Sequence, residues 1–543
     1  MNPSNIKILT FIRKMSVTTL ESLIGTTIVR AIKNSFENAN LESELAKILL
    51  LKYEKKILSV REIRNNLIDS IDITYIDKLC KKNNISDGED YKKRDRLIKY
   101  YHNFNEQNSK VFVDCLGLDS SYVYKTIIDS RASNEEVIIK HGESILLKSY
   151  LHSYQKKIKD EFLSGLTKQG GLSNRFIIQM PTGAGKTYTA LEVVVDTLRK
   201  PSFNKFIVWM VDSNELAEQS FLAFKELWKA KGDRPLRIFR LFKNFEDDYS
   251  QYSDGGVIFT SFSKFHPAIV SKLASITHLI DNTSLLIVDE AHTSVASTHE
   301  ECIRKFINND KTNIVGLTAT PGRSDQYETE ELLRLYSRNK IGLRGEANES
   351  LANPLSYLQD NGYLSTIKSV QLDTDFTFTD NDENRVLRSL AESDDRNKLI
   401  VKQIQLAHKN HESTIIFACT LDHVYALYIL CKESNIDVNF IVGDIEQSER
   451  IDIIERFKRK EFYILINLDI LSKGIDVPNI NKLIITRPVS SPILYSQMIG
   501  RALRGEKNGG NKENTIVNIK DNLTNYVNEN FLYSWFDESW DRD

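Results

Sequence analysis

The chain has 543 residues, which is too long for a single hydrophobic core and predicts about three or four domains. With 41% apolar and 27% charged residues, its composition excludes an intrinsically disordered protein. The net charge of -2 excludes a general attraction to polyanions, so any nucleic-acid affinity must come from a local groove or stripe.

The five cysteines are scattered, and no two of them form a CxxC pair. This spacing argues against a zinc site and against a secreted disulfide framework, and it favours a reducing, cytoplasmic compartment. The first seventeen residues lack the continuous apolar core of a signal peptide, and no apolar run elsewhere could span a bilayer. We therefore expect no zinc and no membrane insertion.

Residues 1–149 show mostly helical periodicity, which predicts a mainly helical accessory domain. Within it, residues 74–101 predict a helix, a turn at Gly88 and a second helix that carries Lys92, Lys93, Arg94 and Arg96. The spacing weakly resembles the SAP type of helix-turn-helix, whose basic residues could contact phosphates. Neighbouring acidic residues dilute this charge, so DNA binding, partner binding and a solvated helical hairpin all stay open.

Residues 150–325 alternate short β-branched runs with helical stretches, and residues 396–510 repeat this pattern. Strands that alternate with helices predict parallel sheets, so the expected fold class is α/β with two tandem domains. Residues 326–395 are polar and less regular, and we expect a connector there. Residues 511–543 follow a Gly/Asn/Lys-rich stretch and are expected to form a C-terminal tail.

The first candidate site is a glycine-rich turn between an apolar strand and a helix. It comprises Thr182, Gly183, Ala184, Gly185, Lys186 and Thr187. Backbone N–H groups of such a turn cradle phosphates, the lysine reaches the β- and γ-phosphates, and the threonine hydroxyl ligates Mg²⁺. The general pattern has glycine where this chain has Met180, and a turn that binds no nucleotide is the alternative.

A second strand, residues 285–288, ends in Asp289 and Glu290. In open α/β sheets ligands bind at the carboxyl ends of the strands, so both carboxylates are expected beside the glycine-rich turn. Asp289 is predicted to hold Mg²⁺, and Glu290 to orient and deprotonate an attacking water. The two motifs in this order indicate an ATP-hydrolysing site.

With Ala291 and His292, these acids complete a segment that resembles the DEAH type of superfamily 2 helicases. The resemblance covers about residues 151–505. Met180–Thr187 and Leu317–Gly322 are most similar to the helicase domains of type I and type III restriction enzymes and related DNA-repair translocases. The resemblance implies two RecA-like domains with ATP and Mg²⁺ in the cleft between them.

The resemblance also assigns roles in the first domain. Gln155, after Tyr154, matches the adenine reader, although His152-Ser153 departs from the family's Arg-Pro. Four residues match segments that contact the nucleic-acid backbone, namely Asp212, Ser213, Thr260 and Ser261. Three more match residues that couple hydrolysis to strand movement, namely His292, Thr318 and Thr320.

In the second domain, Thr420 and Ser472 match nucleic-acid contacts, while Gly474 and Asp476 match ATP contacts. Residues 497–504 match the family's Gln-x-x-Gly-Arg-x-x-Arg signature, with catalytic roles for Gln497, Arg501 and Arg504. The spacing of the two arginines predicts that both lie on one face of a helix and point at one phosphate.

The resemblance thus implies an ATP-dependent DNA helicase or translocase in bacterial restriction, phage defence or DNA repair. An RNA helicase is the first alternative, and a nucleotide-gated assembly protein without processive movement is the second. Tyr53–Lys56 supplies a Glu-x-Lys but no partner aspartate on a strand. No nuclease is therefore expected within the chain, and a separate nuclease or defence-system protein is a candidate partner.

Overall fold

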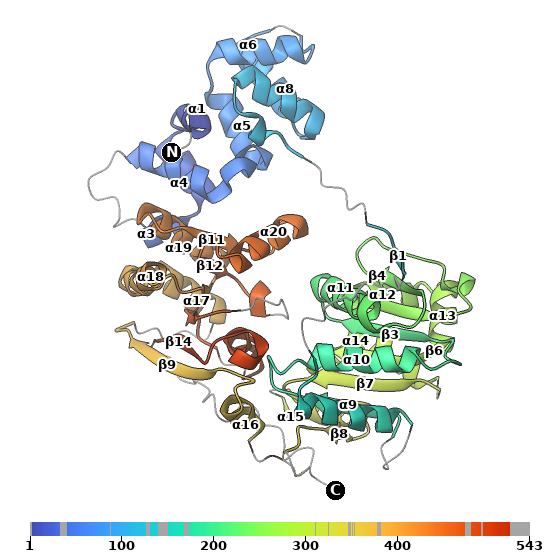
Figure 1. The fold of residues 1–543 in the computed structure, drawn as a ribbon. Coiled ribbons are helices and arrows are strands. Elements are labelled where there is room, and N and C mark those ends of the chain that lie inside the picture. Colours follow the sequence, from blue (N-terminus) through green and yellow to red (C-terminus); the bar gives the residue numbers. More distant parts are fainter. Residues whose placement is uncertain are drawn as a thin grey trace.

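The computed structural model describes residues 3–32, 41–86, 88–125, 131–138, 150–167, 173–309, 311–323, 325–345, 349, 351, 353–376, 382–472, 479–489 and 492–521. These residues form a helical N-terminal region and two α/β domains that lie side by side (Figure 1). None of the helices described is long and apolar enough to cross a membrane.

The N-terminal region consists of short helices that pack on one another (Figure 1). They are α1 (Pro3–Ile12), α2 (Val17–Ile24), α3 (Thr26–Ile32), α4 (Leu41–Tyr53), η2 (Glu54–Ser59), α5 (Arg61–Ser70), α6 (Ile73–Lys82), α7 (Asp90–Tyr100), α8 (Glu106–Leu116) and η3 (Ser120–Tyr122). Ser16 and Asn105 cap the N-termini of α2 and α8 with side-chain oxygens, as helix starts require. Burial of apolar side chains one turn apart, such as Leu45 and Leu49, builds their common core.

The first α/β domain contains an eight-stranded sheet in its described part. Its strands lie in the order β1-β4-β5-β3-β6-β7-β2-β8, and all neighbours are parallel except β1 and β4. The strands are β1 (Asn134–Val137), β2 (Arg175–Gln179), β3 (Phe206–Val211), β4 (Leu236–Leu241), β5 (Gly256–Ser261), β6 (Thr283–Asp289), β7 (Asn313–Thr318) and β8 (Lys340–Ile341).

Helices cover both faces of this sheet. They are α9 (Ser153–Leu166), α10 (Lys186–Leu198), α11 (Asn214–Lys231), α12 (Phe262–Val270), α13 (Ala274–Asp281), α14 (Ser297–Ile307) and α15 (Gln326–Leu335). Successive residues of β3 enter two separate cores, with Ile207 and Trp209 in one and Val208 and Met210 in the other. A strand buried on both faces is a continuous apolar run, which is why the sequence predicts these central strands.

The second α/β domain contains a six-stranded parallel sheet among the described residues, in the order β11-β12-β10-β13-β14-β9. Its strands are β9 (Thr366–Asp373), β10 (Thr414–Phe417), β11 (Val438–Ile441), β12 (Ile464–Asn467), β13 (Lys482–Ile485) and β14 (Glu513–Lys520). Its helices are α16 (Pro354–Asp360), α17 (Glu383–Glu392), α18 (Asp394–Lys409), α19 (Leu421–Glu433), α20 (Gln447–Lys458) and α21 (Pro492–Ile499). The predicted α/β fold class, with two parallel sheets after a helical region, is confirmed.

Four strands of the two sheets lie outside the predicted α/β segments. The expected connector, 326–395, contains β8, which pairs with β2 of the first sheet, and β9. The expected tail, 511–543, contains β14, which pairs with β9 along its whole length. The expected helical domain, 1–149, contains β1, which pairs with the first sheet. Strands β1 and β9 lie at sheet edges and are polar, and β14 follows the glycine-rich stretch, so none resembles a buried strand.

Residues 74–101 form the predicted pair of helices, α6 and α7, but their basic side chains have partners within the region. Arg94 donates to the backbone oxygens of Ile68 and Ile71 and pairs with Asp90. Three further basic residues also pair locally: Lys92 with Glu89, Lys93 with Asp77, and Arg96 with Ser86. This pairing supports a structural role for the hairpin.

The N-terminal helices pack on the second α/β domain rather than on the first. Helix α3 contacts α17, α18 and α19, and α4 contacts α19. Polar links reinforce this contact, because Thr27 and Arg30 donate to Glu392 and Tyr428 donates to Glu54. Since β1 joins the first sheet, the N-terminal region contacts both α/β domains (Figure 1).

Candidate functional site

The glycine-rich turn connects β2 to α10 at the carboxyl end of the first sheet. Gly183 and Gly185 both have φ of 82°, a left-handed conformation that glycine adopts without strain. Lys186 begins α10 and its side chain is buried. The turn therefore presents the N-terminus of a helix, which favours an anion such as a phosphate.

Helix α9 fixes the other side of this turn. The Tyr154 hydroxyl and the Gln155 amide both donate to the Ala184 backbone oxygen, at 3.0 and 3.1 Å. The Gln155 oxygen also accepts from the His152 backbone N–H, which closes the first turn of α9. Gln155, the predicted adenine reader, thus lies against the phosphate-binding turn, and Tyr154 is a supporting residue that the motif alone does not assign.

Asp289 and Glu290 lie at the end of β6, two strands from β2. The Thr187 hydroxyl donates a 3.0 Å hydrogen bond to the Asp289 carboxylate. Burial, and then the nearby Glu290 charge, raise the pKa of Asp289 to about 6, while Lys186 acts in the opposite direction. A buried carboxylate beside a hydroxyl fits a Mg²⁺ ion, because both are oxygen ligands and the cation would compensate the buried charge.

Glu290 adopts φ of 53°, a left-handed conformation that is uncommon for a residue with a side chain. Its backbone N–H donates to Asp289 at 3.0 Å, and its own carboxylate stays one-fifth exposed. Strained residues of this kind persist at sites where a side chain must be aimed. The arrangement leaves Glu290 accessible to a water molecule while Asp289 is enclosed.

The predicted coupling residues lie together behind Glu290. His292 Nδ1 lies 3.5 Å from the Glu290 carboxylate and 3.2 Å from the Thr318 hydroxyl. The Thr318 hydroxyl donates to the Thr320 backbone oxygen and accepts from its N–H. Burial lowers the pKa of His292, so the ring is neutral at physiological pH.

The second domain reaches this site with the segment that follows α21. Gln497 Nε2 lies 3.4 Å from His292 Nε2. A Cβ added to Gly500 would overlap the Thr182 side chain, and a Cβ on Gly183 would lie 3.2 Å from Leu364 and 3.5 Å from Leu503. The signature motif of one domain therefore packs directly on the phosphate-binding turn of the other.

The prediction that Arg501 and Arg504 share one face of a helix was wrong. Helix α21 ends at Ile499, a single 3-10 turn covers Gly500–Ala502, and Arg504 forms an isolated bridge with Leu364. Glycine ends the helix here because the backbone must approach Thr182 closely. Arg501 donates through Nε to the Gln497 backbone oxygen at 3.3 Å, so the turn holds this arginine beside the site.

The predicted nucleic-acid contacts fall into two groups. Ser213 caps α11, Thr420 caps α19, and Asp212 lies 3.8 Å from His299, all at partly exposed loop positions. Thr260 and Ser261 are fully buried, and their hydroxyls donate to the Leu241 oxygen and to Asn214, so the predicted nucleic-acid contact of this segment stays a prediction. A buried polar residue at a strand end satisfies neighbouring polar groups in this way.

Three predicted residues have little or no description. Gly474 and Asp476 lie outside the described residues, and Ser472 is described only through its backbone in the short helix η6 (Ile470–Ser472). Their expected roles toward ATP and nucleic acid stay predictions.

Sequence reasoning also missed two groups that link the domains. His152 Nε2 hydrogen-bonds Asn508 at 2.8 Å, and its ring lies 4.6 Å from Tyr363. Arg450 on α20 pairs with Glu215 on α11 at 2.9 Å. The residues in each pair are hundreds of positions apart, so no local spacing could reveal them.

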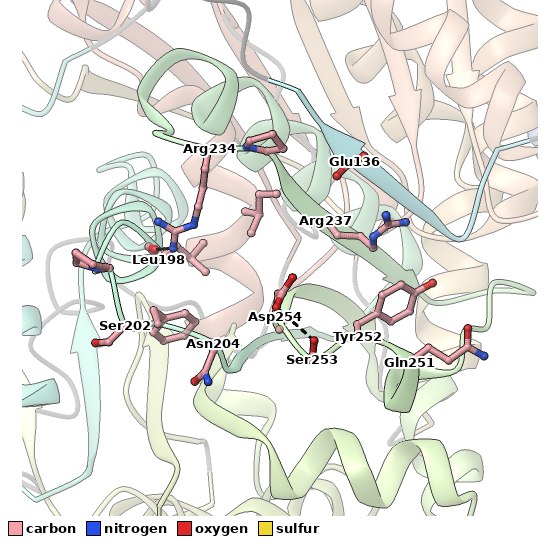
Figure 2. A pocket seen from close by; sticks show the side chains of 15 residues that line it. Glu136, Leu198, Ser202, Asn204, Arg234, Arg237, Gln251, Tyr252, Ser253 and Asp254 are labelled. Atoms are coloured by element: carbon pink, nitrogen blue, oxygen red, sulfur yellow. Dashed lines mark hydrogen bonds between the residues drawn. The ribbon is translucent and has the colours of Figure 1, made fainter.

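A separate cavity of about 600 Å³ lies at the amino ends of β3, β4 and β5 (Figure 2). Arg234, Arg237, Tyr252 and Asp254 are among its lining residues. This is the opposite end of the sheet from Lys186 and Asp289. The cavity is therefore distinct from the site described above.

Two family models match the two α/β domains. The model described as "Type III restriction enzyme, res subunit" matches residues 148–323, and the model described as "Helicase conserved C-terminal domain" matches residues 395–506. The first match begins just before α9 and the second at the start of α18, and together they contain Lys186, Asp289 and Arg501.

Several curated proteins are similar to more than half of the chain. The putative ATP-dependent helicase IRC3 of Saccharomyces cerevisiae is 28% identical over 65% of this chain and 49% of its own length. The type I restriction enzyme EcoKI endonuclease subunit of Escherichia coli is 24% identical over 60% of this chain and 31% of its own. A putative ATP-dependent RNA helicase of Methanocaldococcus jannaschii is 23% identical over 65% of this chain and 57% of its own. The chain spans about half the length of the curated relatives it matches first.

Proposed function

The chain belongs to superfamily 2 of the helicases, among the members related to restriction enzymes, and from this we propose that it is an ATP-driven motor that moves on DNA. ATP would bind between its two RecA-like domains. Hydrolysis would change the distance between the two domains and so move the bound DNA strand.

One observation carries the proposal: the site is completed only when both domains meet. Thr182 of the phosphate-binding turn packs on Gly500, and His292 beside Glu290 reaches Gln497. Hydrolysis in such a site depends on domain closure, because groups from one domain act on a nucleotide held by the other. A nucleotide-binding domain that does not move would not need residues from a second domain at its site.

The residues divide the chemistry among them. Lys186 and the N–H groups of the turn hold the phosphates, and Glu290 accepts a proton from the attacking water. Arg501, and Arg504 three residues later, would stabilise charge on the transferred phosphoryl group. Thr187 and Asp289 would hold Mg²⁺, which neutralises phosphate charge when bound.

DNA is favoured over RNA by the similarity to the restriction-enzyme subunit, while the archaeal relative named as an RNA helicase makes RNA the alternative. ATP hydrolysis is measured with single-stranded DNA, duplex DNA and RNA at about 50 to 200 mM salt. We expect DNA to stimulate turnover, with a steep decrease as salt rises. Stimulation by RNA alone would overturn the DNA assignment, and no stimulation by any nucleic acid would favour an assembly protein.

The biological setting is part of the same proposal. Restriction, phage defence or DNA repair would use such a motor, with a separate nuclease or defence-system protein as partner. Copurification of the chain with the products of genes adjacent to its own tests this, and a chain that moves on DNA without any stable partner would contradict it.

A further inference from the structure

The cavity at the amino ends of β3, β4 and β5 lies apart from the proposed ATP site and offers a second place for a ligand (Figure 2). Its volume of about 600 Å³ is in the range of sites that enclose small ligands or a few side chains. Apolar residues form part of its wall, namely Leu198, Pro201, Phe203, Pro235 and Leu236. Phe203 is half-buried and Leu236 is buried, so an apolar side chain of a ligand would extend an apolar surface that already exists.

Arg237 of β4 brings a positive charge to this cavity. Its Nη1 donates to the Asn134 side-chain oxygen at 2.9 Å, and its guanidinium carbon lies 5.2 Å from the centre of the Tyr252 ring. Among the residues that the structure describes, no carboxylate forms an ion pair with Arg237, although Glu136 lies opposite it on β1. A guanidinium presents several N–H groups in one plane, so Arg237 keeps donors for the carboxylate of a ligand.

The segments that form or border the cavity, residues 198–205, 234–237 and 251–255, carry more basic than acidic residues. The basic residues are Arg199, Lys200, Lys205, Arg234 and Arg237, and the acidic residue is Asp254. The first three of these basic residues are exposed. Glu136 adds an acid from β1, and Asp233 pairs with Arg234 beside the cavity. The excess of positive charge attracts an acidic ligand.

Residues 522–543 have the complementary chemistry. They follow β14, lie outside the described residues, and include six aromatic residues, namely Tyr526, Phe531, Tyr533, Trp535, Phe536 and Trp540. Five acidic residues accompany a single arginine, and they are Glu529, Asp537, Glu538, Asp541 and Asp543. Aromatic rings are stabilised by burial, so this composition predicts that the segment binds a surface that is both apolar and positively charged.

We propose that the cavity binds this acidic aromatic segment, residues 522–543. In an extended chain alternate side chains lie on one side, so Phe536 and Glu538 can enter the cavity together. The ring of Phe536 packs against Phe203, and the carboxylate of Glu538 pairs with Arg237. Binding within one chain and binding between two copies use the same contacts, and they differ only in their dependence on concentration.

The test uses the full chain with Ser534→p-benzoylphenylalanine. This change places a photoreactive group on the side of the extended segment that Phe536 and Glu538 share. After irradiation, mass spectrometry of the digested protein identifies the cross-linked residues. We expect cross-links to residues 198–205, 234–237 or 251–255. A yield that stays constant on dilution supports binding within one chain, and a yield that falls supports binding between copies.

Two further changes remove the proposed ion pair from either side. Arg237→Gln should lower the cross-link yield roughly tenfold, the usual effect of losing a hydrogen bond to a charged group. The double variant Asp537→Asn with Glu538→Gln should have a similar effect. It leaves every residue of the cavity unchanged, so misfolding of the first domain cannot explain its result. Arg304→Gln removes a positive charge from an exposed position of α14, as a matched control, and should behave as the wild type.

Three results would overturn the proposal. The first is a cross-link pattern that does not include the cavity, and the second is an unchanged yield in the double variant. The third is an equal loss of yield in Arg304→Gln, which would show a general attraction of charge rather than a site. The cavity lies at the opposite end of the sheet from Lys186 and Asp289, so these results are independent of ATP hydrolysis and of the proposed function.

Discussion

His292 and Gln497 belong to different domains, yet their Nε2 atoms lie 3.4 Å apart. His292 also lies 3.5 Å from Glu290 and 3.2 Å from Thr318, so Gln497 is one residue away from both the proposed base and the coupling motif. This contact is a route by which the second domain can sense the nucleotide.

Gln497→Ala should therefore lower nucleic-acid-stimulated turnover by about 5- to 100-fold, the range of a coupling of a few kcal/mol, while nucleotide affinity changes little. Turnover and nucleotide Kd are measured in parallel. Gln405→Ala, at an exposed position of α18, is the control. An unchanged stimulated rate in Gln497→Ala would show that the contact between Gln497 and His292 does not affect ATP hydrolysis.

Glu290→Gln should lower ATP turnover by about 10² to 10⁴, the usual contribution of a general base, and leave ATP binding intact. The amide keeps the shape of the side chain but cannot accept the proton. Single-turnover hydrolysis and a fluorescent-nucleotide titration distinguish the two effects. Near-normal turnover would assign the base to another residue.

Lys186→Ala should weaken nucleotide binding as well as turnover, because Lys186 is the cation at the phosphate-binding turn. The measurement is a titration of nucleotide binding on the wild type and the variant. Lys200→Ala, at an exposed position just beyond α10, is the control for loss of a positive charge. Equal affinity in Lys186→Ala and wild type would contradict the assignment of the turn.

Arg396→Leu should destabilise the second domain by about 3–5 kcal/mol, since it leaves the Asp521 carboxylate buried without its partner. The pair is fully buried, with 2.9 Å contacts from Nε and Nη2 to the two carboxylate oxygens. Urea denaturation reports the change. Adding Asp521→Asn should recover part of the loss, and Arg385→Ala, whose pair with Asp382 is exposed, should have little effect.

The stability of the second domain should fall as the pH falls below about 6.5, the pKa of an unfolded histidine. Burial lowers the pKa of His423 to about 3, and its ring lies between Asn397 and the Cys419 N–H. The unfolded chain therefore takes up a proton that the folded chain cannot, and by pH 5 the loss reaches about 2 kcal/mol. Denaturation at pH 7 and pH 5 should show a smaller pH dependence in His423→Gln than in the wild type. Equal pH dependence would show that His423 titrates normally.

The sequence predicted most of what lies within one domain. Central strands such as β3 are continuous apolar runs, which the sequence shows directly. The residues after β2 and β6 follow known motifs, so Lys186 and Asp289 could be placed in advance at the carboxyl ends of two strands of one sheet. Polar strands such as β1 and β9 have no such pattern, because in the described part of the chain each lies at the edge of its sheet and is not buried on both faces.

Contacts between the domains could not be predicted from spacing. The Gly500 backbone approaches Thr182, and this contact, rather than helix propensity, decides where α21 ends. Likewise, Thr260 and Ser261 match a motif by position, but their hydroxyls are used to satisfy neighbouring groups inside the domain. Similarity to a motif predicts the function of a segment, but it does not show which of its atoms are exposed.

The double attachment of the N-terminal region limits how the molecule can move. Its helices are fixed to the second domain and β1 is fixed to the first, with the chain between Tyr122 and Ser133 as the covalent link. A link of this length spans at most about 40 Å when fully extended. The chain between the two sheets is a second covalent link between the same two domains. The two links together limit how far the domains can separate when they move.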